Sequence, residues 1–424
     1  MTGTTNTRSY DYDPQTAQVV ELKGSYNTQT REYYTSPPLI KQETIEIHGA
    51  ETFMSDYRYS AEGKLQQCTN AHNQKQSVEY DEFGRPSYLV QGNLKVTFAY
   101  SKANRLSDYG VEDLEKGVQM KCALAYDEFG RESERVVRRG EKTLLSLSQT
   151  YGNTGLITTR VLKDKQGVIL LSENFAYDNQ NRLSEYECGG TQATVDEKRN
   201  QLLKQSFKFD NFGNIVERTT VFQDQSRNIT RYTYSQNDPT QLVEITNTNG
   251  AYRANIVLEY DANGCLTKDE EGRELEYNTL GQLIAVRGTD GKILCEYRYD
   301  ASGKLACQIG SDQQTTYLLY REDTLIATKT DERRVSYVSD GESYWGQVVQ
   351  DGRTEQLQNQ LWVSDGHESV LAWLDSRNPE ELHLQTIIPM DLERNHPSLS
   401  KGSGKTQLPD GITWGTDAES IIQL

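Results

Sequence analysis

Residues 80–86 read YDEFGRP, and close copies return as YDEFGRE at 126–132, YDNQNRL at 177–183 and YDASGKL at 299–305. Ten copies share one pattern: an aromatic residue, usually followed by Asp or Ser, then two variable residues, then Gly or Asn. Gly and Asn together make up roughly a tenth of a typical chain, so chance does not explain their presence in every copy. The aromatic residues are Tyr59, Tyr80, Tyr100, Tyr126, Tyr151, Tyr177, Phe209, Tyr260, Tyr277 and Tyr299. The residues four positions later are Gly63, Gly84, Asn104, Gly130, Gly155, Asn181, Gly213, Gly264, Gly281 and Gly303.

Each copy predicts the tight turn of a β-hairpin. Gly and Asn tolerate the left-handed backbone conformation that a hairpin loop of three to five residues requires. An Asp after the aromatic residue can accept a backbone N–H two residues on, which forms an Asx turn. The flanking sequence alternates, as in SVEYD at 77–81 and QLIAVRG at 282–288, and this period of two is typical of strands. The repeat aspartates include Asp81, Asp127, Asp178, Asp261 and Asp300.

The hairpins extend over most of the chain. Degenerate copies begin at Tyr12 and Tyr234, and residues 315–330 predict a further hairpin. A lone hairpin is marginal in water, so each unit must pair with its neighbours and propagate a sheet. Such a sheet has exposed edges and twists unless it closes or is covered. We therefore predict an all-β protein whose tandem hairpins form one long, curved, wrapping sheet, with helix confined to short connectors and the C-terminal tail.

The composition fits a sheet with a thin core. The chain has 26 Tyr and 32 Gly, while only 35% of its residues are hydrophobic. Tyr suits half-buried strand positions, and Gly suits tight turns. The net charge of −17 disfavours binding to the phosphates of nucleic acids. No run of about 18 apolar residues is present, so we expect no membrane span.

The N-terminus and the cysteines bear on cellular location. Residues 1–8 are polar and lack the apolar core of a Sec signal peptide. We expect synthesis in the cytoplasm and, as part of a larger assembly, secretion by a non-Sec route. The cysteines are widely spread and form no CxxC pair, which indicates free thiols in a reducing compartment. They are Cys68, Cys122, Cys188, Cys265, Cys295 and Cys307.

The phrase Y-D-x-x-G-R-L and its spacing resemble the YD repeats of the RHS family over about residues 10 to 390. Two later stretches resemble the shell-forming part of bacterial RHS toxins and of toxin-complex C-type subunits: YREDTLIAT at 320–328 and WVSDGHESVLAWL at 362–374. IIPMDLE at 387–393 stands where that family usually has a Y-x-P-Y-G-like phrase. The resemblance implies a hollow or partly open β-shell that encloses or presents a toxin polypeptide. It also implies a protein partner, either another shell subunit or the enclosed polypeptide.

The chain departs from this family at the self-cleavage site. The resemblance implies an aspartate-dependent autoproteolytic core with Asp-Pro-x-Gly phrases after the repeats. Here the Asp-Pro pairs are Asp13-Pro14 and Asp238-Pro239, both in repeat turns and neither followed by the expected Gly. We therefore predict that the chain is not an enzyme and has no catalytic residues. If an autoprotease exists, its candidates are Asp365, Asp375, Asp391 and Asp410.

The repeats divide the chain into four segments. We predict an N-terminal β segment with a degenerate repeat at 1–50, the hairpin array at 51–330, a non-repeat β segment at 331–394, and a tail rich in Ser, Gly, Lys and Pro at 395–424 with a short helix near its end. The tryptophans support the boundary near residue 330, because all of them follow it. They are Trp345, Trp362, Trp373 and Trp414.

Other motifs favour structural interpretations. KGSGKT at 401–406 resembles a phosphate loop, but Leu399 occupies the place of the first Gly, so a flexible linker is the better interpretation. The repeat aspartates are explained by turn capping. The histidines stand singly, so we expect neither a metal nor a cofactor. The repeat tyrosines could form a sugar-binding stripe, although stacking between strands is the favoured interpretation. The histidines are His48, His72, His367, His383 and His396.

Three functions stay open on the sequence alone. The first is a structural shell of an RHS or toxin-complex system. The second is an adhesin-like module that binds glycans or proteins. The third, which the missing Asp-Pro-x-Gly phrases disfavour, is an RHS-type aspartyl autoprotease.

Overall fold

The computed structural model describes residues 8–365 and 370–384, and within these ranges every regular element is a β-strand. The strands form two antiparallel sheets, of 21 and 13 strands, and within each sheet strands that follow one another in sequence are paired. The prediction of an all-β protein made of hairpins is confirmed. The described connectors are turns without helix, and the tail at 395–424 lies outside the described residues.

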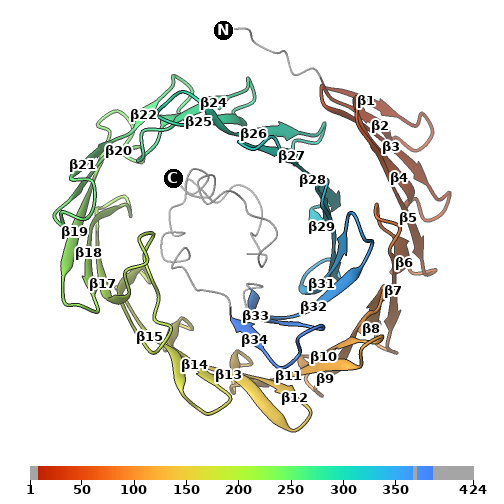
Figure 1. The fold of residues 1–424 in the computed structure, drawn as a ribbon, viewed down its shortest axis with the longest axis horizontal. Coiled ribbons are helices and arrows are strands. Elements are labelled where there is room, and N and C mark those ends of the chain that lie inside the picture. The colour runs from red at the N-terminus through yellow and green to blue at the C-terminus, as the bar shows by residue number, and fades with distance from the viewer. Residues whose placement is uncertain (1–7, 366–369, 385–424) are drawn as a thin grey trace.

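The chain curls into a coil, and its last strands pass inside its first ones (Figure 1). We call β1–β25 the first winding and β26–β34 the second winding. The first winding consists of β1 (Ser9–Tyr12), β2 (Val19–Lys23), β3 (Asn27–Tyr33), β4 (Ile40–Ile47), β5 (Thr52–Tyr59), β6 (Leu65–Thr69), β7 (Lys75–Tyr80), β8 (Pro86–Gln91), β9 (Leu94–Tyr100), β10 (Leu106–Asp113), β11 (Val118–Tyr126), β12 (Glu132–Arg139), β13 (Lys142–Tyr151), β14 (Ile157–Asp164), β15 (Ile169–Tyr177), β16 (Leu183–Gly189), β17 (Leu202–Phe209), β18 (Ile215–Phe222), β19 (Arg227–Tyr234), β20 (Leu242–Asn247), β21 (Asn255–Val257), β22 (Glu259–Tyr260), β23 (Leu266–Lys268), β24 (Glu274–Tyr277) and β25 (Leu283–Arg287). The second winding consists of β26 (Ile293–Tyr299), β27 (Leu305–Gly310), β28 (Thr315–Arg321), β29 (Thr324–Lys329), β30 (Arg333–Ser339), β31 (Tyr344–Asp351), β32 (Leu357–Ser364), β33 (Val370–Asp375) and β34 (Leu382–Leu384).

The two sheets adjoin at residues 257–259, and backbone hydrogen bonding continues across the junction. β21 pairs with β20, and β22, which begins two residues later, pairs with β23. Between them, the Leu258 N–H donates to the carbonyl of Val243 at 3.0 Å. The pairing also runs on through residue 330, from β29 to β30. The division of the chain into four segments stays a prediction.

A β-bulge beside each repeat turn supplies the curvature. In β7 and β8, Tyr80 faces Pro86 while Glu79 faces Tyr88, so Ser87 is the extra residue. Bulges bend a strand and increase its twist, and an open sheet of more than about ten strands curls. The repetition of one bulge in almost every hairpin therefore turns the meander into a coil. The same register shift occurs beside Tyr59, Tyr100, Tyr126, Tyr151, Tyr177, Phe209, Tyr234, Tyr260, Tyr277 and Tyr299.

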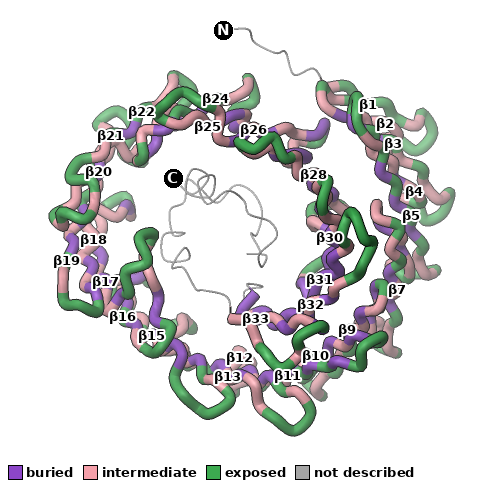
Figure 2. The backbone as a smooth tube through the Cα atoms, in the orientation of Figure 1, coloured by how far each residue is buried: buried purple, intermediate pink, exposed green. Residues whose placement is uncertain are grey.

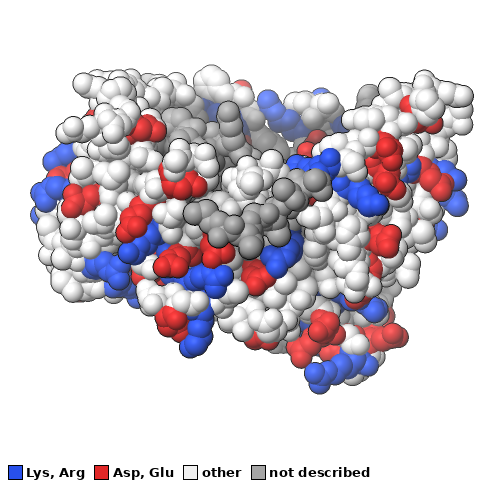
Figure 3. Space-filling model, turned by 90° about the horizontal axis from the view of Figure 1, so that it is seen from above, with Lys and Arg blue, Asp and Glu red and all other residues white. Residues whose placement is uncertain are grey.

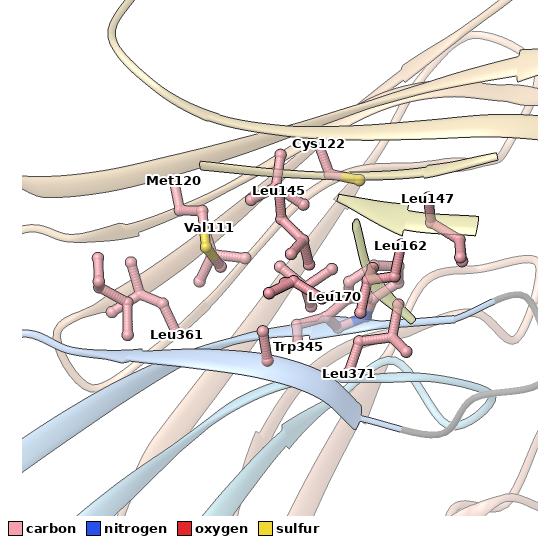
Figure 4. Packing of buried hydrophobic residues seen from close by; sticks show 14 of the residues in the cluster. Val111, Met120, Cys122, Leu145, Leu147, Leu162, Leu170, Trp345, Leu361 and Leu371 are labelled. Atoms are coloured by element: carbon pink, nitrogen blue, oxygen red, sulfur yellow. The ribbon is translucent and has the colours of Figure 1, made fainter. Parts of the chain in front are cut away.

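The main core lies between the two windings, and we call this layer the seam. Figure 4 shows Met120 and Leu145 of the first winding facing Trp345, Leu361 and Leu371 of the second. Buried residues occur along both windings, and the exposed residues gather in the turns (Figure 2). Two sheets packed face to face bury such a layer at a spacing of about 10 Å. The thin core that the composition predicts is therefore shared between the two windings of the coil.

Candidate functional site in the repeat turns and the seam

The repeat aspartate closes its own turn. One carboxylate oxygen of Asp81, Oδ1, accepts the backbone N–H groups of Phe83 at 3.0 Å and Arg85 at 2.9 Å. The other, Oδ2, accepts the Arg85 Nε–H at 2.7 Å. The side-chain hydrogen bond from Arg85 is the main reason that the pKa of Asp81 lies below its usual value. Asp127 with Arg131 and Asp178 with Arg182 repeat these bonds, so the aspartates are occupied as turn caps.

The Gly or Asn of each turn has a left-handed backbone. In all ten copies φ lies between 61° and 97°. At Gly264, where φ is 81°, an added Cβ would meet no atom within 4 Å. Glycine is therefore favoured at this position because of the backbone conformation, and not because a larger side chain would clash.

The repeat tyrosines connect successive hairpins. The hydroxyl of Tyr80 donates to the carbonyl of Leu65 at 2.8 Å, and Leu65 lies two residues after the preceding turn glycine, Gly63. Burial raises the pKa of the Tyr299 hydroxyl to about 12, so this hydroxyl stays a donor. The same bond joins Tyr100 to Pro86, Tyr126 to Leu106, Tyr151 to Glu132, Tyr177 to Ile157, Tyr260 to Leu242 and Tyr299 to Leu283.

The residue after the turn glycine adds a second connection. The guanidinium of Arg85 lies 4.2 Å from the ring centre of Tyr100, in the next repeat. Arg131 lies over Tyr151 and Arg182 over Phe209, both at 4.3 Å. The arginines cover one face of these aromatic rings, and the tyrosine hydroxyls are hydrogen-bonded within the sheet. These contacts favour the stacking interpretation over a sugar-binding stripe. Two of the ten repeat aromatic residues make different contacts. The Tyr59 ring meets the Tyr34 ring edge to face, with 6.3 Å between the ring centres, and Tyr277 packs on a small core around Leu275.

Polar side chains hold the two windings together within the seam. Gln29 donates to Asp300 at 3.1 Å, and Asn70 donates to Ser336 at 3.0 Å. Asn359 donates to Asp113 at 2.8 Å, and Asp113 is fully buried. The sequence analysis missed this set of contacts. No local signal in the sequence marks these residues, because an amide or a carboxyl in an alternating strand also suits an exposed position.

The sequence distance across the seam shortens along the coil. Tyr10 donates to the Ala301 carbonyl, 291 residues away, whereas Arg135 donates to the Ser364 carbonyl, 229 residues away. The second winding therefore covers the same arc with fewer residues, as a coil that tightens inward must. Arg160 reaches Asp365 at 3.9 Å and joins Arg135 in fixing the end of β32.

The remaining candidates form no reactive cluster among the described residues. Asp375 accepts Gln358 Nε2–H at 2.6 Å and the Arg377 backbone N–H at 2.8 Å. In this part of the chain no group of three or more His, Cys, Asp or Glu side chains could hold a metal ion. Asp391, Asp410, His367, His396, Trp414, the KGSGKT stretch and the IIPMDLE stretch lie outside the described residues.

The cysteines are free thiols, and five of the six are buried. Burial raises the pKa of the Cys122 thiol to about 11 and also raises that of Cys68. A thiol must ionise to react as a nucleophile, so these two cysteines have low reactivity near neutral pH.

The surface in view in Figure 3 carries acidic and basic side chains intermingled, without a large patch of one sign. Within the described ranges, no helix has the length and hydropathy needed to cross a membrane.

Comparison with known proteins assigns the fold to a family. A family model of the teneurin YD-shell matches residues 1–339. The chain belongs to the teneurin YD-shell family. The resemblance to YD-repeat proteins that the turn phrase indicated is therefore confirmed. A shell or scaffold role follows from this family and from the coiled sheet.

Solved structures show the same fold as this YD-shell chain. The Tc holotoxin pore of Photorhabdus luminescens is 15% identical with a TM-score of 0.54, over 85% of this chain and 20% of that one. A crystal structure of TcdB2–TccC3 is 14% identical with a TM-score of 0.52, over 85% of this chain and 23% of that one. The chain thus spans less than a quarter of the length of either. No curated protein matches the sequence.

Proposed function

We propose that this YD-shell chain is a non-catalytic wall that surrounds a polypeptide guest, as part of a larger toxin-type assembly. The observation that carries the proposal is the seam. The second winding packs inside the first, and a shared hydrophobic core joins the two where they overlap. A wall of this kind separates what lies inside the coil from proteases and solvent. The neighbours named Tc holotoxin and TcdB2–TccC3 support the same setting, since both belong to toxin complexes.

The partners that we propose are proteins, either the guest or another shell subunit. Among the described strands, β1 pairs only with β2 and all of its residues are exposed. A strand with one unpaired edge can accept a strand from another chain. Export by a non-Sec route belongs to the same proposal, since a guest inside the wall would leave the cell with it.

A protease-protection experiment tests the enclosure. A short unstructured reporter with one protease site is fused after Leu424, and a second protein carries the same site in the exposed β10–β11 turn, between Glu115 and Lys116. We expect cleavage of the C-terminal site to be at least about tenfold slower. Equal cleavage rates in the two folded proteins would reject the enclosure.

A further inference from the structure

A polar cavity lies in the seam near the start of the coil. It is enclosed by β3 and β4 of the first winding and by β27, β28 and their turns in the second, which lie inside β3 and β4 in Figure 1. Its volume of about 30 Å³ is room for about two water-sized spheres. The polar side chains that line it include Asn27, Gln29, Arg31, Glu43, Asp300 and Lys304.

Two buried amides in the lining lack hydrogen-bond partners. Among the described residues, neither Nδ2 nor Oδ1 of Asn27 has a partner, and Oε1 of Gln29 has none. Asn27 is 1% exposed and Gln29 is 5% exposed. Buried polar groups in native proteins are nearly always paired, because an unpaired one loses its hydrogen bonds to water without replacement. The two amides therefore indicate a polar ligand in this cavity.

The charge of Asp300 indicates that this ligand is a cation. In the turn of Asp81, Arg85 donates to the second carboxylate oxygen. Lys304 holds the same position after Asp300, but its ammonium group lies 3.0 Å from Asp323 instead. Within the part of the chain that the structure describes, no Lys or Arg side chain pairs with Asp300, which is only 6% exposed. A buried carboxylate requires a compensating charge, and a bound cation would supply it.

Several oxygen atoms can reach one ion in this cavity. Asp300 Oδ2 accepts the Gln29 Nε2–H at 3.1 Å, so the two side chains are in contact across the seam. Half a turn of the Gln29 amide about its last bond exchanges its nitrogen and its oxygen, and the oxygen then faces Asp300. Arg31 Nε binds only one carboxylate oxygen of Glu43, at 2.8 Å, which leaves the other for the ion. The Oδ1 atom of Asn27 completes the set.

We propose that this cavity binds one calcium ion, which joins the two windings near the start of the coil. Its protein ligands are side-chain oxygens of Asn27, Gln29, Glu43 and Asp300. Calcium binds carboxylate and amide oxygens together with water in a flexible geometry. Magnesium requires a near-ideal octahedron and keeps several of its own waters, for which a cavity of about 30 Å³ is too small. The inference goes beyond the proposed function, because it requires no guest inside the wall.

The proposed site explains why acidic and histidine clusters gave no sign of it. It contains two carboxylates and two amides, and therefore differs from a group of three or more His, Cys, Asp or Glu side chains. The sequence analysis expected no metal for the same reason, since Asn27 and Gln29 carry no metal-binding motif. The ligands also come from both ends of the sequence, and only the coil brings them together.

Thermal denaturation of the full chain tests calcium binding. The protein is melted in EDTA and in about 5 mM CaCl₂ at matched ionic strength, where a site with a dissociation constant of about 10⁻⁴ M is nearly full. We expect calcium to raise the melting temperature by about 3 °C. Isothermal titration calorimetry with CaCl₂ should show one site of this affinity. The absence of both the temperature shift and the binding heat would overturn the proposal.

Three variants assign the response to the cavity. Asn27→Leu removes an unpaired amide at similar volume, so in EDTA it should be at least as stable as the wild type while its calcium response is lost. Asp300→Asn keeps the shape of the turn and should weaken calcium binding at least about tenfold. Asp261→Asn, at the same turn position of another repeat, is the matched control and should respond as the wild type does. A wild-type response in either cavity variant, or a lost response in the control, would overturn the proposal.

Hydrogen exchange shows where calcium acts. Calcium should slow amide exchange in peptides of β3, β4, β27 and β28, which surround the cavity. It should leave exchange unchanged in β17 and β18, on the opposite side of the coil (Figure 1). Calcium-dependent protection that is absent from the first set of strands would contradict a site in the seam.

Discussion

The hydroxyl of Tyr177 donates a 2.8 Å hydrogen bond to the carbonyl of Ile157, twenty residues earlier in the chain and in the preceding hairpin. Seven of the ten repeats use the hydroxyl of their tyrosine in this way to hold the hairpin before it. In addition, Arg85, Arg131 and Arg182 stack on the aromatic residue of the next repeat. The side chains of the repeat phrase therefore both close their own turn and connect neighbouring hairpins.

Removing one of these hydroxyls should weaken the coil measurably. We expect Tyr177→Phe to lower the free energy of unfolding by about 1 kcal/mol, the net value of an intramolecular hydrogen bond. Urea denaturation followed by circular dichroism measures the change. Tyr12→Phe, at a 56% exposed tyrosine of β1, is the control and should alter stability by less than half as much. Equal effects of the two substitutions would show that the bond to Ile157 contributes nothing.

The one repeat with phenylalanine offers the reverse experiment. The Phe209 ring lies under Arg182 as the tyrosine rings lie under theirs, and Leu183 stands two residues after the turn residue Asn181. We expect Phe209→Tyr to place a hydroxyl near the Leu183 carbonyl and to raise stability by about 0.5–1 kcal/mol. The same urea titration measures it. A loss of stability would mean that the rings of this repeat are placed differently.

Backbone conformation should dominate at the turn glycines. Gly264→Ala adds a methyl group into open space but at φ 81°, so we expect a loss of about 1–2 kcal/mol from the left-handed conformation alone. Gly250→Ala also meets no atom within 4 Å and has no left-handed φ, so it should be neutral or slightly stabilising. Thermal denaturation of the pair measures the difference. Matching melting temperatures would argue against a conformational role for Gly264.

His72 should make the seam sensitive to mild acid. Its ring lies 3.2 Å from Ser336 Oγ, and burial, followed by the charges of Arg334 and Lys329, lowers its pKa from 6.5 to about 4. As the pH falls below 6.5 the unfolded chain binds a proton that the folded chain does not, so stability declines until about pH 4. We expect a loss of about 2 kcal/mol between pH 7 and pH 5.

The control for this pH effect is a residue that cannot titrate. His72→Gln should lose distinctly less stability than the wild type between pH 7 and pH 5, when both are measured by urea denaturation in matched salt. His48→Gln, at an exposed histidine, should retain the wild-type loss. An identical pH profile for wild type and His72→Gln would show that the ring is accessible in the folded protein.

The turns could be predicted from the sequence because everything that specifies them lies within five residues. Asp81, Gly84 and Arg85 carry the capping carboxylate, the left-handed backbone and the bound guanidinium in one short phrase. Hairpins and an all-β sheet follow from such phrases and from the alternation around them. The curvature was predicted only in outline, since the bulge residue Ser87 carries no distinctive chemistry.

The seam could not be predicted in the same way. Gln29 and Asp300 lie 271 residues apart, and their contact depends on the summed bending of all the hairpins between them. Nothing local marks Gln29 as a partner, because an amide in a strand also suits an exposed position. The apolar group around Trp362, on the face of the second winding opposite the seam, was equally hidden, since only the packing of Leu361 in the seam fixes Trp362 on that opposite face.

The most direct test of the coil is a cross-link between Asn70 and Ser336, which lie 266 residues apart and form a 3.0 Å hydrogen bond across the seam. Asn70→Cys with Ser336→Cys, in a Cys265→Ser background, is treated with a short bismaleimide at low protein concentration and analysed by intact-mass spectrometry and peptide mapping. The control pair is Asn70→Cys with Ser302→Cys. We predict an intramolecular link in most molecules of the first pair and in few of the control pair. Equal, low yields in both pairs would contradict a second winding packed inside the first.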